Sequence, residues 1–285
     1  MTIVITGATG HLGRLIVEAL LREGTPASDI VATGRDLEKL SELQAKGVRV
    51  ARADYSDPES LGTAFAGADT LMLVSGSEVG QRVAQHTAAI DAARAAGIQR
   101  IVYTSAPGAT TSALVLAPEH KATEEYLAAS GIPFTILRNN WYTENYVQTA
   151  RQAAESGAVV ASVGDGRAAS ASRRDYADAA AAVLTGTGHD GRTYELSGDE
   201  AWDYTQLAAT LTELLGRPVA YTPVSPEEHF EILRRAGLDE GTAGFVVALD
   251  ANTRDGLLAG TSGELRELIG RPTTPLKEGL AAALA

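Results

Sequence analysis

The stretch TGATGHLGR, residues Thr6 to Arg14, decides the fold, and it directly follows the short apolar run at residues 3–5. Its glycines, Gly7, Gly10 and Gly13, stand three residues apart where an expected strand passes into an expected helix. In a parallel α/β sheet, the first strand-to-helix turn presents unpaired backbone N–H groups and the positive end of a helix. We therefore predict that this turn holds the pyrophosphate of a dinucleotide.

Each glycine has a separate expected task. Gly7 permits the tight turn, Gly10 lets the pyrophosphate approach the backbone, and Gly13 lets the helix pack closely on the strand. The spacing is one residue wider than G-x-G-x-x-G, so the prediction depends on the position of the motif after the first strand; the alternative is a glycine-rich turn without a ligand. The residues of this stretch that we expect to bind the cofactor are Thr6, Gly7, Thr9, Gly10, His11, Leu12 and Gly13, with His11 contributing through its backbone.

Composition narrows the possible partners. The chain has 285 residues, 45% of them hydrophobic, with 24 basic against 36 acidic residues and a net charge of -12. This charge argues against nucleic acid and anionic membranes as partners and favours small molecules or proteins; we expect a monomer or a homodimer. The absence of cysteine excludes disulfides and thiolate chemistry, and the five scattered histidines lack metal-ligand spacing, so we expect no metal. Because no apolar run is long enough to span a membrane and no basic leader precedes the first strand, we expect a cytoplasmic protein.

Short β-branched runs alternate with longer alanine-rich segments of helical period, which predicts a doubly wound (Rossmann) parallel sheet covered by helices. Residues 1–138 are expected to form the dinucleotide-binding core, with 158–197 returning to it. Residues 139–157 and 198–285 are expected to form a smaller C-terminal lobe that binds substrate. The expected strands of the core lie at residues 2–5, 29–33, 48–53, 70–74, 100–104 and 133–137, and the helices between them include 11–22, 37–46 and 80–96.

The end of the second strand should decide between NAD and NADP. An acid there favours the free ribose of NAD, and an arginine favours the 2′-phosphate of NADP. Arg35 follows Gly34 and is our phosphate contact, whereas Asp36 is either a ribose ligand or the N-cap of the next helix. NADP(H) is therefore preferred, with NAD(H) as the alternative. Asp54 and Tyr55 are placed to touch the adenine.

At this point the residues resemble a family. The motif at residues 6–13, the step Ala53-Asp54-Tyr55 and the stretch TILRN at 135–139 are similar to the NmrA-like branch of the atypical short-chain dehydrogenases. The segments SEVGQR at 77–82 and LRNNWYTENY at 137–146 resemble the bacterial type-2 NAD(P)H:quinone oxidoreductases of that branch, and the resemblance covers nearly the whole chain. It implies an NADPH-dependent quinone reductase without flavin. Related dye reductases of the triphenylmethane type, and NmrA-like redox sensors that bind NADP without catalysis, are the alternatives.

The chain departs from the catalytic pattern of mainstream short-chain dehydrogenases, which pair tyrosine with lysine as Y-x-x-x-K. Lys121 is in register, but Ala117 stands where the tyrosine would be, and Ser105 stands where the family serine would be. The catalytic residue is therefore unknown, with Lys121 and Tyr142 as candidates; Lys121 is equally well explained as a surface residue near Glu125. Quinones tolerate this loss, because the reduced product is a weaker base than an alkoxide and water can supply the proton.

Residues beyond the carboxyl ends of later strands complete the expected site. Ser75, Gly76 and Ser77 should line the nicotinamide side together with Asn139. Trp141 could stack on a flat ring or anchor the core between the lobes. His120 neighbours Lys121 and could face the active site, but we expect it on a helix surface. The predicted substrate-binding residues are Asn140, Trp141, Tyr142, Thr143, Glu144 and Arg173.

Overall fold

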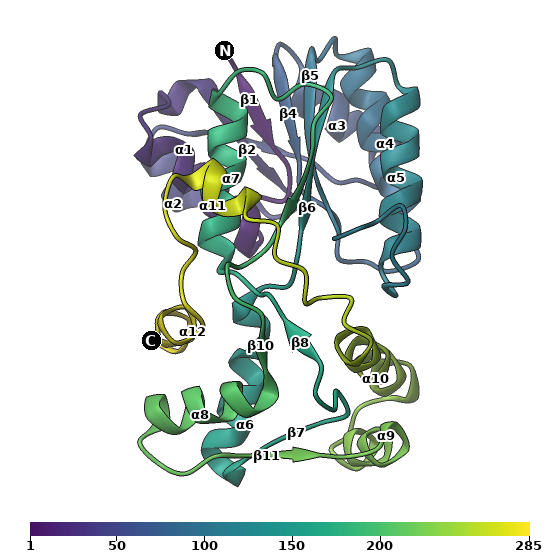
Figure 1. Cartoon of the computed structure of the whole chain (residues 1–285). Helices are drawn as coiled ribbons and strands as arrows, with labels where there is room; N and C mark the ends of the chain where they lie inside the picture. Colours follow the sequence, from purple (N-terminus) through teal and green to yellow (C-terminus); the bar gives the residue numbers. More distant parts are fainter.

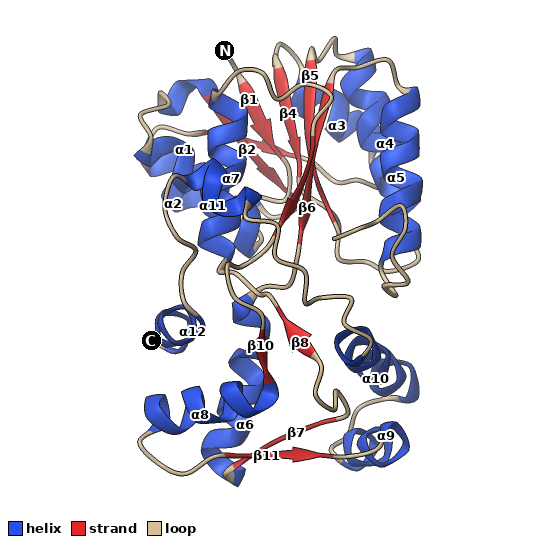
Figure 2. Cartoon of the chain, viewed as in Figure 1, coloured by secondary structure: helices blue, strands red, loops and turns tan.

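The computed structural model describes all 285 residues, and a seven-stranded sheet forms its larger part (Figures 1 and 2). The strand order is β3-β2-β1-β4-β5-β6-β9, and every neighbouring pair is parallel. The order reverses between β1 and β4, which is where open α/β sheets bind their ligands. The strands are β1 (Ile3–Ile5), β2 (Ile30–Gly34), β3 (Arg49–Arg52), β4 (Thr70–Leu73), β5 (Arg100–Ser105), β6 (Phe134–Asn139) and β9 (Thr193–Leu196).

Helices cover both faces of this sheet, because its central strands are apolar on both sides (Figure 1). The core of 27 buried residues on one face includes α1 (His11–Arg22), α2 (Ser41–Ala45), α7 (Arg173–Thr185) and α11 (Glu264–Ile269). The core of 19 buried residues on the other face includes α3 (Pro58–Phe65), α4 (Arg82–Ala95) and α5 (Ala117–Ala129). The short 3₁₀ helices η1 (Ala27–Asp29) and η2 (Leu37–Leu40) lie beside β2.

A smaller lobe lies beyond the carboxyl ends of the strands (Figure 2). Its two sheets have two strands each: β7 (Ala158–Ala161) is parallel to β11 (Ala220–Pro223), and β8 (Arg167–Ala168) is antiparallel to β10 (Trp202–Asp203). A third core of 17 buried residues holds this lobe together. Its helices are η3 (Thr143–Tyr146), α6 (Val147–Ser156), α8 (Tyr204–Leu215), α9 (Pro226–Arg235), α10 (Glu240–Arg254) and α12 (Leu276–Leu284).

The predicted α/β fold is confirmed, and the observed strands of the sheet differ from the predicted ones mainly at their ends. The path of the later chain differs from the expectation for residues 158–197. Of that stretch, α7 and β9 join the large sheet, whereas β7 and β8 pair inside the smaller lobe. Helix α11, expected in the lobe, packs against α7 and buries Leu265 in the core of the large sheet. Such pairings join distant segments, so local periodicity does not specify them.

Candidate active site

The glycine turn leaves the amino end of α1 open to an anion. Gly7 has a φ of +62°, and its carbonyl oxygen accepts a hydrogen bond from the Gly10 N–H at 2.9 Å. A Cβ added to Gly13 would lie 2.4 Å from the Gly7 oxygen, so only glycine permits this approach of helix to turn. Gly10 is the N-cap of α1; no side chain caps the helix and its first turn holds no acid. The free N–H groups of this turn therefore suit a pyrophosphate.

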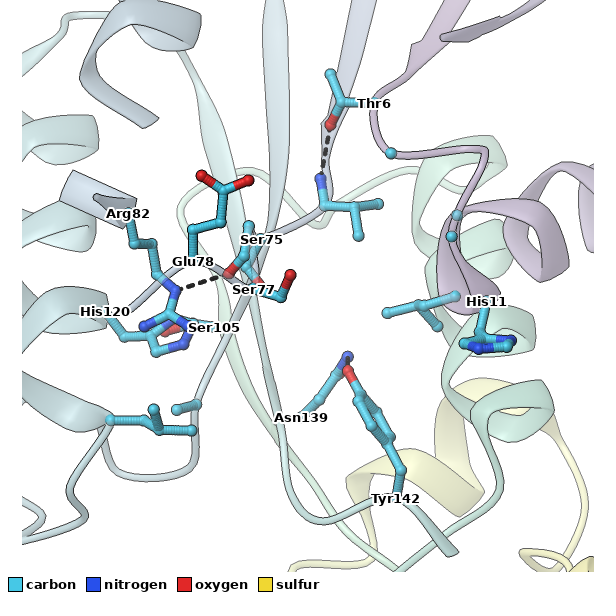
Figure 3. Close-up of a pocket in the computed structure, with 18 of the residues that line it drawn as sticks. Thr6, His11, Ser75, Ser77, Glu78, Arg82, Ser105, His120, Asn139 and Tyr142 are labelled. Carbon is cyan, nitrogen blue, oxygen red and sulfur yellow. Dashed lines mark hydrogen bonds between the residues drawn. The ribbon is translucent and has the colours of Figure 1, made fainter. Parts of the chain in front are cut away.

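A cleft of about 580 Å³ runs from this turn to the smaller lobe (Figure 3). The ends of β1, β2, β4, β5 and β6 form one side of it, and Trp141, Phe245 and Leu258 contribute from the lobe side. The cleft brings together every residue that the sequence predicted for the cofactor: Thr6, Gly7, Thr9, Gly10, His11, Leu12, Gly13, Arg35, Asp54, Tyr55, Ser75, Gly76, Ser77 and Asn139.

At the outer end of the cleft, Arg35 is the basic side chain at the end of β2. Its guanidinium is 69% exposed and lies 3.1 Å from a carboxylate oxygen of Glu78. Asp36 does not line the cleft; its carboxylate accepts a hydrogen bond from the Glu38 N–H and caps η2. Of the two expected roles of Asp36, ribose ligand or helix N-cap, the structure shows the N-cap. Arg35 is free to exchange Glu78 for another anion.

Asp54 and Tyr55, which follow β3, have different tasks within the protein. Asp54 accepts a hydrogen bond from the Ser56 N–H at 3.0 Å, which stabilises the turn after β3. The Tyr55 hydroxyl donates to the Val74 carbonyl at 2.6 Å and lies 2.7 Å from Thr6 Oγ1. Burial raises the pKa of Tyr55 well above its usual value, so this hydroxyl keeps its proton and ties β1, β3 and β4 together.

The segment after β4, which contains Gly76, is held by hydrogen bonds between its backbone and two side chains of α4. The Gly76 N–H donates to His86 Nε2 at 3.0 Å, and the Gly76 carbonyl accepts from Arg82 Nε at 2.9 Å. Burial, and next to it the charge of Arg82, lower the pKa of His86 to about 3. His86 is therefore neutral, with its proton on Nδ1 toward Thr123 Oγ1 at 3.1 Å.

Asn139 offers an unsatisfied acceptor inside the cleft. Its side chain is buried, its Oδ1 has no hydrogen-bond partner, and its Nδ2 lies 3.4 Å from the Tyr142 hydroxyl. An enclosed carbonyl oxygen without a donor is costly, and a shift of the Asn139 side chain toward the cleft would let a ligand's N–H or O–H group satisfy it. Together with the uncapped α1 turn, this atom fits a nicotinamide dinucleotide, whose carboxamide and ribose carry such donors.

Ser105 has lost its freedom to donate into the cleft. Its hydroxyl donates to Glu124 Oε1 at 2.6 Å, and Glu124 accepts two hydrogen bonds from Arg138, at 2.9 and 2.6 Å. Hydrogen bonds to Glu124 come first among the causes that raise the pKa of Arg138, so the Arg138 guanidinium keeps its charge. The proton of Ser105 is committed to a carboxylate, and Ser105 can serve a ligand in the cleft only as an acceptor.

Four of the predicted substrate residues line the cleft. Asn140 is tied to the lobe, because its Nδ2 donates to the Leu258 carbonyl at 3.0 Å and its Oδ1 accepts from the Trp141 N–H at 2.8 Å. Trp141 is partly buried against the lobe core and also lines the cleft, so both of its expected roles are compatible with its position. The Arg173 guanidinium lies 4.8 Å from the centre of the Tyr142 ring and fixes it from one side.

Three candidates lie outside the cleft, which corrects the expected placement of Thr143 and Glu144 and agrees with the alternative of a surface position for Lys121. Thr143 is buried and its hydroxyl is 2.9 Å from Ser170 Oγ. Glu144 accepts two hydrogen bonds from the Arg173 N–H at the start of α7. Lys121 is exposed, and its ammonium lies 3.8 Å from Glu125 on the same helix face. Each of these side chains already has a partner within the protein, and none reaches the ligand space.

Sequence reasoning also missed several side chains that line the cleft. His120, expected on a helix surface, is only 5% exposed and faces inward beside Ser105 (Figure 3). Arg82 is buried in an ion pair with Glu119 at 2.5 Å. Neither α4 nor α5 has the apolar stripe that marks a buried helix face, so the sequence pattern contains no signal for these side chains. Further lining residues include Glu78, Val79, Gln85, Leu114, Leu116, Asn145, Phe245 and Leu258.

Comparisons with known proteins also point to a nicotinamide dinucleotide as the ligand of this fold. A family model described as NAD(P)H-binding matches residues 7–187. The chain belongs to this NAD(P)H-binding family. It is 47% identical to quinone oxidoreductase 2 of Escherichia coli over 98% of this chain and 97% of that one. It is 28% identical to the NAD(P)H azoreductase of Xenophilus azovorans over 97% and 96%. An NmrA-like oxidoreductase of Aspergillus flavus also matches, over 100% of this chain and 95% of that one at 29% identity, which confirms the predicted branch.

Solved structures agree with the sequence matches. The Escherichia coli NADPH-dependent quinone oxidoreductase complexed with NADPH superposes with a TM-score of 0.95 at 46% identity, covering 100% of both chains. The Citrobacter triphenylmethane reductase complexed with NADP(H) gives a TM-score of 0.94 at 41% identity, covering 99% of this chain and 100% of that one.

No helix of the protein has the length and apolar character needed to cross a membrane. No group of three or more histidine, aspartate or glutamate residues is arranged to hold a metal ion.

Proposed function

We propose that this protein is an NADPH-dependent quinone oxidoreductase that passes hydride directly to a quinone without flavin. One observation carries the proposal: the uncapped α1 turn and the wall formed by Trp141 and Tyr142 open into the same cleft. A dinucleotide bound at the turn and a flat acceptor against the wall therefore share one space. The similarity to a quinone oxidoreductase of Escherichia coli supports this reading over the full length of the chain.

The protein's own contribution is binding and orientation. NADPH, when bound, supplies the hydride from its nicotinamide. The N–H groups of the α1 turn would hold the pyrophosphate, Arg35 would hold the 2′-phosphate, and Asn139 would orient the nicotinamide end from the end of β6. Trp141 offers a flat face to the acceptor ring, and the apolar side chains of Phe245 and Leu258 reduce the access of water.

The absence of a Tyr-Lys pair fits this acceptor class. A ketone needs a strong acid near its oxygen, because an alkoxide is a strong base. A quinone becomes an aromatic hydroquinone anion, which is a much weaker base and takes its proton from water. With Lys121 on the surface and Ser105 committed to Glu124, the cleft is better suited to quinones than to ordinary ketones.

A reductase of triphenylmethane dyes is the second candidate, favoured by the similarity to the Citrobacter enzyme. An NADP-binding sensor without catalysis is the third. Loss of NADPH absorbance should be followed with purified, flavin-free protein and a panel of benzoquinones, naphthoquinones and triphenylmethane dyes. We expect turnover that is fastest with quinones and does not increase on addition of FMN or FAD. Binding of NADPH without turnover of any acceptor would replace our proposal with the sensor.

A further inference from the structure

His120 lies at the acceptor end of the cleft, in a place that none of the tasks described so far requires. It is the fourth residue of α5, its side chain is 5% exposed, and it lines the cleft near Ser105 and Arg82 (Figure 3). A histidine that only filled space would be expected to have both ring nitrogens satisfied by the protein. Only its Nδ1 has a partner here, and that partner is the Tyr103 hydroxyl at 2.7 Å.

Tyr103 determines which ring nitrogen of His120 carries the proton. Tyr103 is fully buried on β5, and its hydroxyl lies 2.7 Å from His120 Nδ1. Burial raises the pKa of Tyr103 far above its ordinary value, so the hydroxyl stays protonated and can donate to Nδ1. In the arrangement in which Tyr103 donates, Nδ1 is the acceptor and the neutral His120 ring carries its proton on Nε2.

The Nε2–H group is left for a ligand. Nε2 has no hydrogen-bond partner in the protein, and it is not among the enclosed unsatisfied atoms, so it is open to the cleft. Burial, followed by the charges of Arg82 and His86, lowers the pKa of His120 to about 3. The ring is therefore a neutral donor near pH 7. Arg82 is itself fixed by Glu119 at 2.5 Å and by the Gly76 carbonyl at 2.9 Å.

We propose that the Nε2–H of His120 is the hydrogen-bond donor to the acceptor oxygen on which negative charge develops during reduction. This inference rests on the proposed quinone reductase function. Hydride transfer brings two electrons and one hydrogen nucleus to the quinone, which becomes a hydroquinone monoanion as the cofactor is oxidised. A proton from water then completes the hydroquinone. His120 keeps its own proton throughout, because giving it up would leave an imidazolate; its contribution is electrostatic, like that of other fixed neutral donors at developing oxyanions.

Two amide variants separate this role from a structural one. The amide nitrogen of His120→Gln reaches the position of Nε2 and keeps a donor in the cleft, whereas His120→Asn reaches only the position of Nδ1 and keeps a partner for Tyr103. We expect kcat with a benzoquinone to fall roughly 100-fold in His120→Asn and at most about tenfold in His120→Gln. The dissociation constant for NADPH, measured by calorimetry, should stay within about twofold of the original in both variants. The opposite order of the two rates, or an unchanged rate in His120→Asn, would overturn the proposal.

A measurement without turnover tests the same claim independently. In ¹⁵N-histidine-labelled protein, assigned with the His120→Gln variant, the ring nitrogens of His120 should show a neutral imidazole protonated on Nε2 from about pH 5 to pH 8. In Tyr103→Phe, with its fold checked by circular dichroism, the Nδ1-protonated form should appear and kcat should fall. A charged ring, or a proton on Nδ1 in the original protein, refutes the proposal. Failure of the original protein to reduce any quinone, with the expected tautomer present, would instead locate the error in the proposed function.

Discussion

Replacement of Arg35 by alanine should weaken NADPH binding and leave NADH binding nearly unchanged. A charge-assisted hydrogen bond to a phosphate contributes about 1.5–3 kcal/mol, which corresponds to roughly a 10- to 100-fold change in affinity. Arg35 must first release Glu78, and that exposed pair, 3.1 Å apart, stabilises the free protein by at most about 1 kcal/mol. The net effect of Arg35→Ala on NADPH is therefore nearer tenfold.

Glu78→Gln provides the matched variant, because it removes the anion that competes with the 2′-phosphate and keeps the hydrogen bond from Gln85 possible. It should strengthen NADPH binding by up to about fivefold, the equivalent of 1 kcal/mol. Calorimetry with NADPH, NADH and 2′,5′-ADP reads each affinity directly, at low and at raised salt. Equal losses of NADPH and NADH affinity in Arg35→Ala would refute the assignment of the phosphate to Arg35.

Three further predictions concern the glycine turn, the acceptor wall and the buried histidines. Gly13→Ala places a Cβ 2.4 Å from the Gly7 oxygen and 2.9 Å from Ala8 Cα, so it should lower the melting temperature and abolish cofactor binding. The control variant Gly62→Ala lies in open space on α3 and should be neutral or stabilising. Equal melting temperatures of the two variants would count against the packing argument. Trp141→Leu should lower kcat/KM for quinones with little change in NADPH affinity, and an unchanged rate would leave Trp141 with a structural role only. The pKa values of His86 and His120 are lowered to about 3 in the folded state, so only the unfolded chain protonates these histidines as pH falls below about 6.5. The free energy of unfolding should therefore fall by up to about 2 kcal/mol for each histidine between pH 6.5 and pH 5. Urea unfolding at the two pH values should show this loss, and the loss should be smaller in His86→Asn.

The residues predicted best are those whose role depends only on their neighbours in the sequence. The turn at residues 6–13 was predicted from glycine spacing after a strand, and the helix predicted over 11–22 has those bounds in the structure. Arg35 and Asp36 could be placed because their roles depend on where β2 ends. In each case a few adjacent residues contain the whole physical argument.

His120 was misplaced for the opposite reason. The inward face of α5 carries His120, Thr123 and Glu124, so the helix lacks the apolar stripe that marks a buried face. Their burial is stabilised by partners on other elements: Tyr103 for His120, His86 for Thr123, and Ser105 with Arg138 for Glu124. These partners come together only after the sheet forms. A pattern read along one helix does not contain them.

The adjacent residues Asn139 and Asn140 mark the boundary between the large sheet and the smaller lobe within the cleft. The Asn139 side chain lies at the end of β6 with an unpaired oxygen, and Asn140 is fastened to the loop after α10 through Leu258. Trp141, Phe245 and Leu258, which line the cleft beside the smaller lobe, follow this point in the chain, whereas the glycine turn and Arg35 precede it. Mutation of these later residues can therefore change the acceptor side of the cleft without altering the glycine turn, which suits a scaffold whose relatives carry the names of quinone, azo and dye reductases.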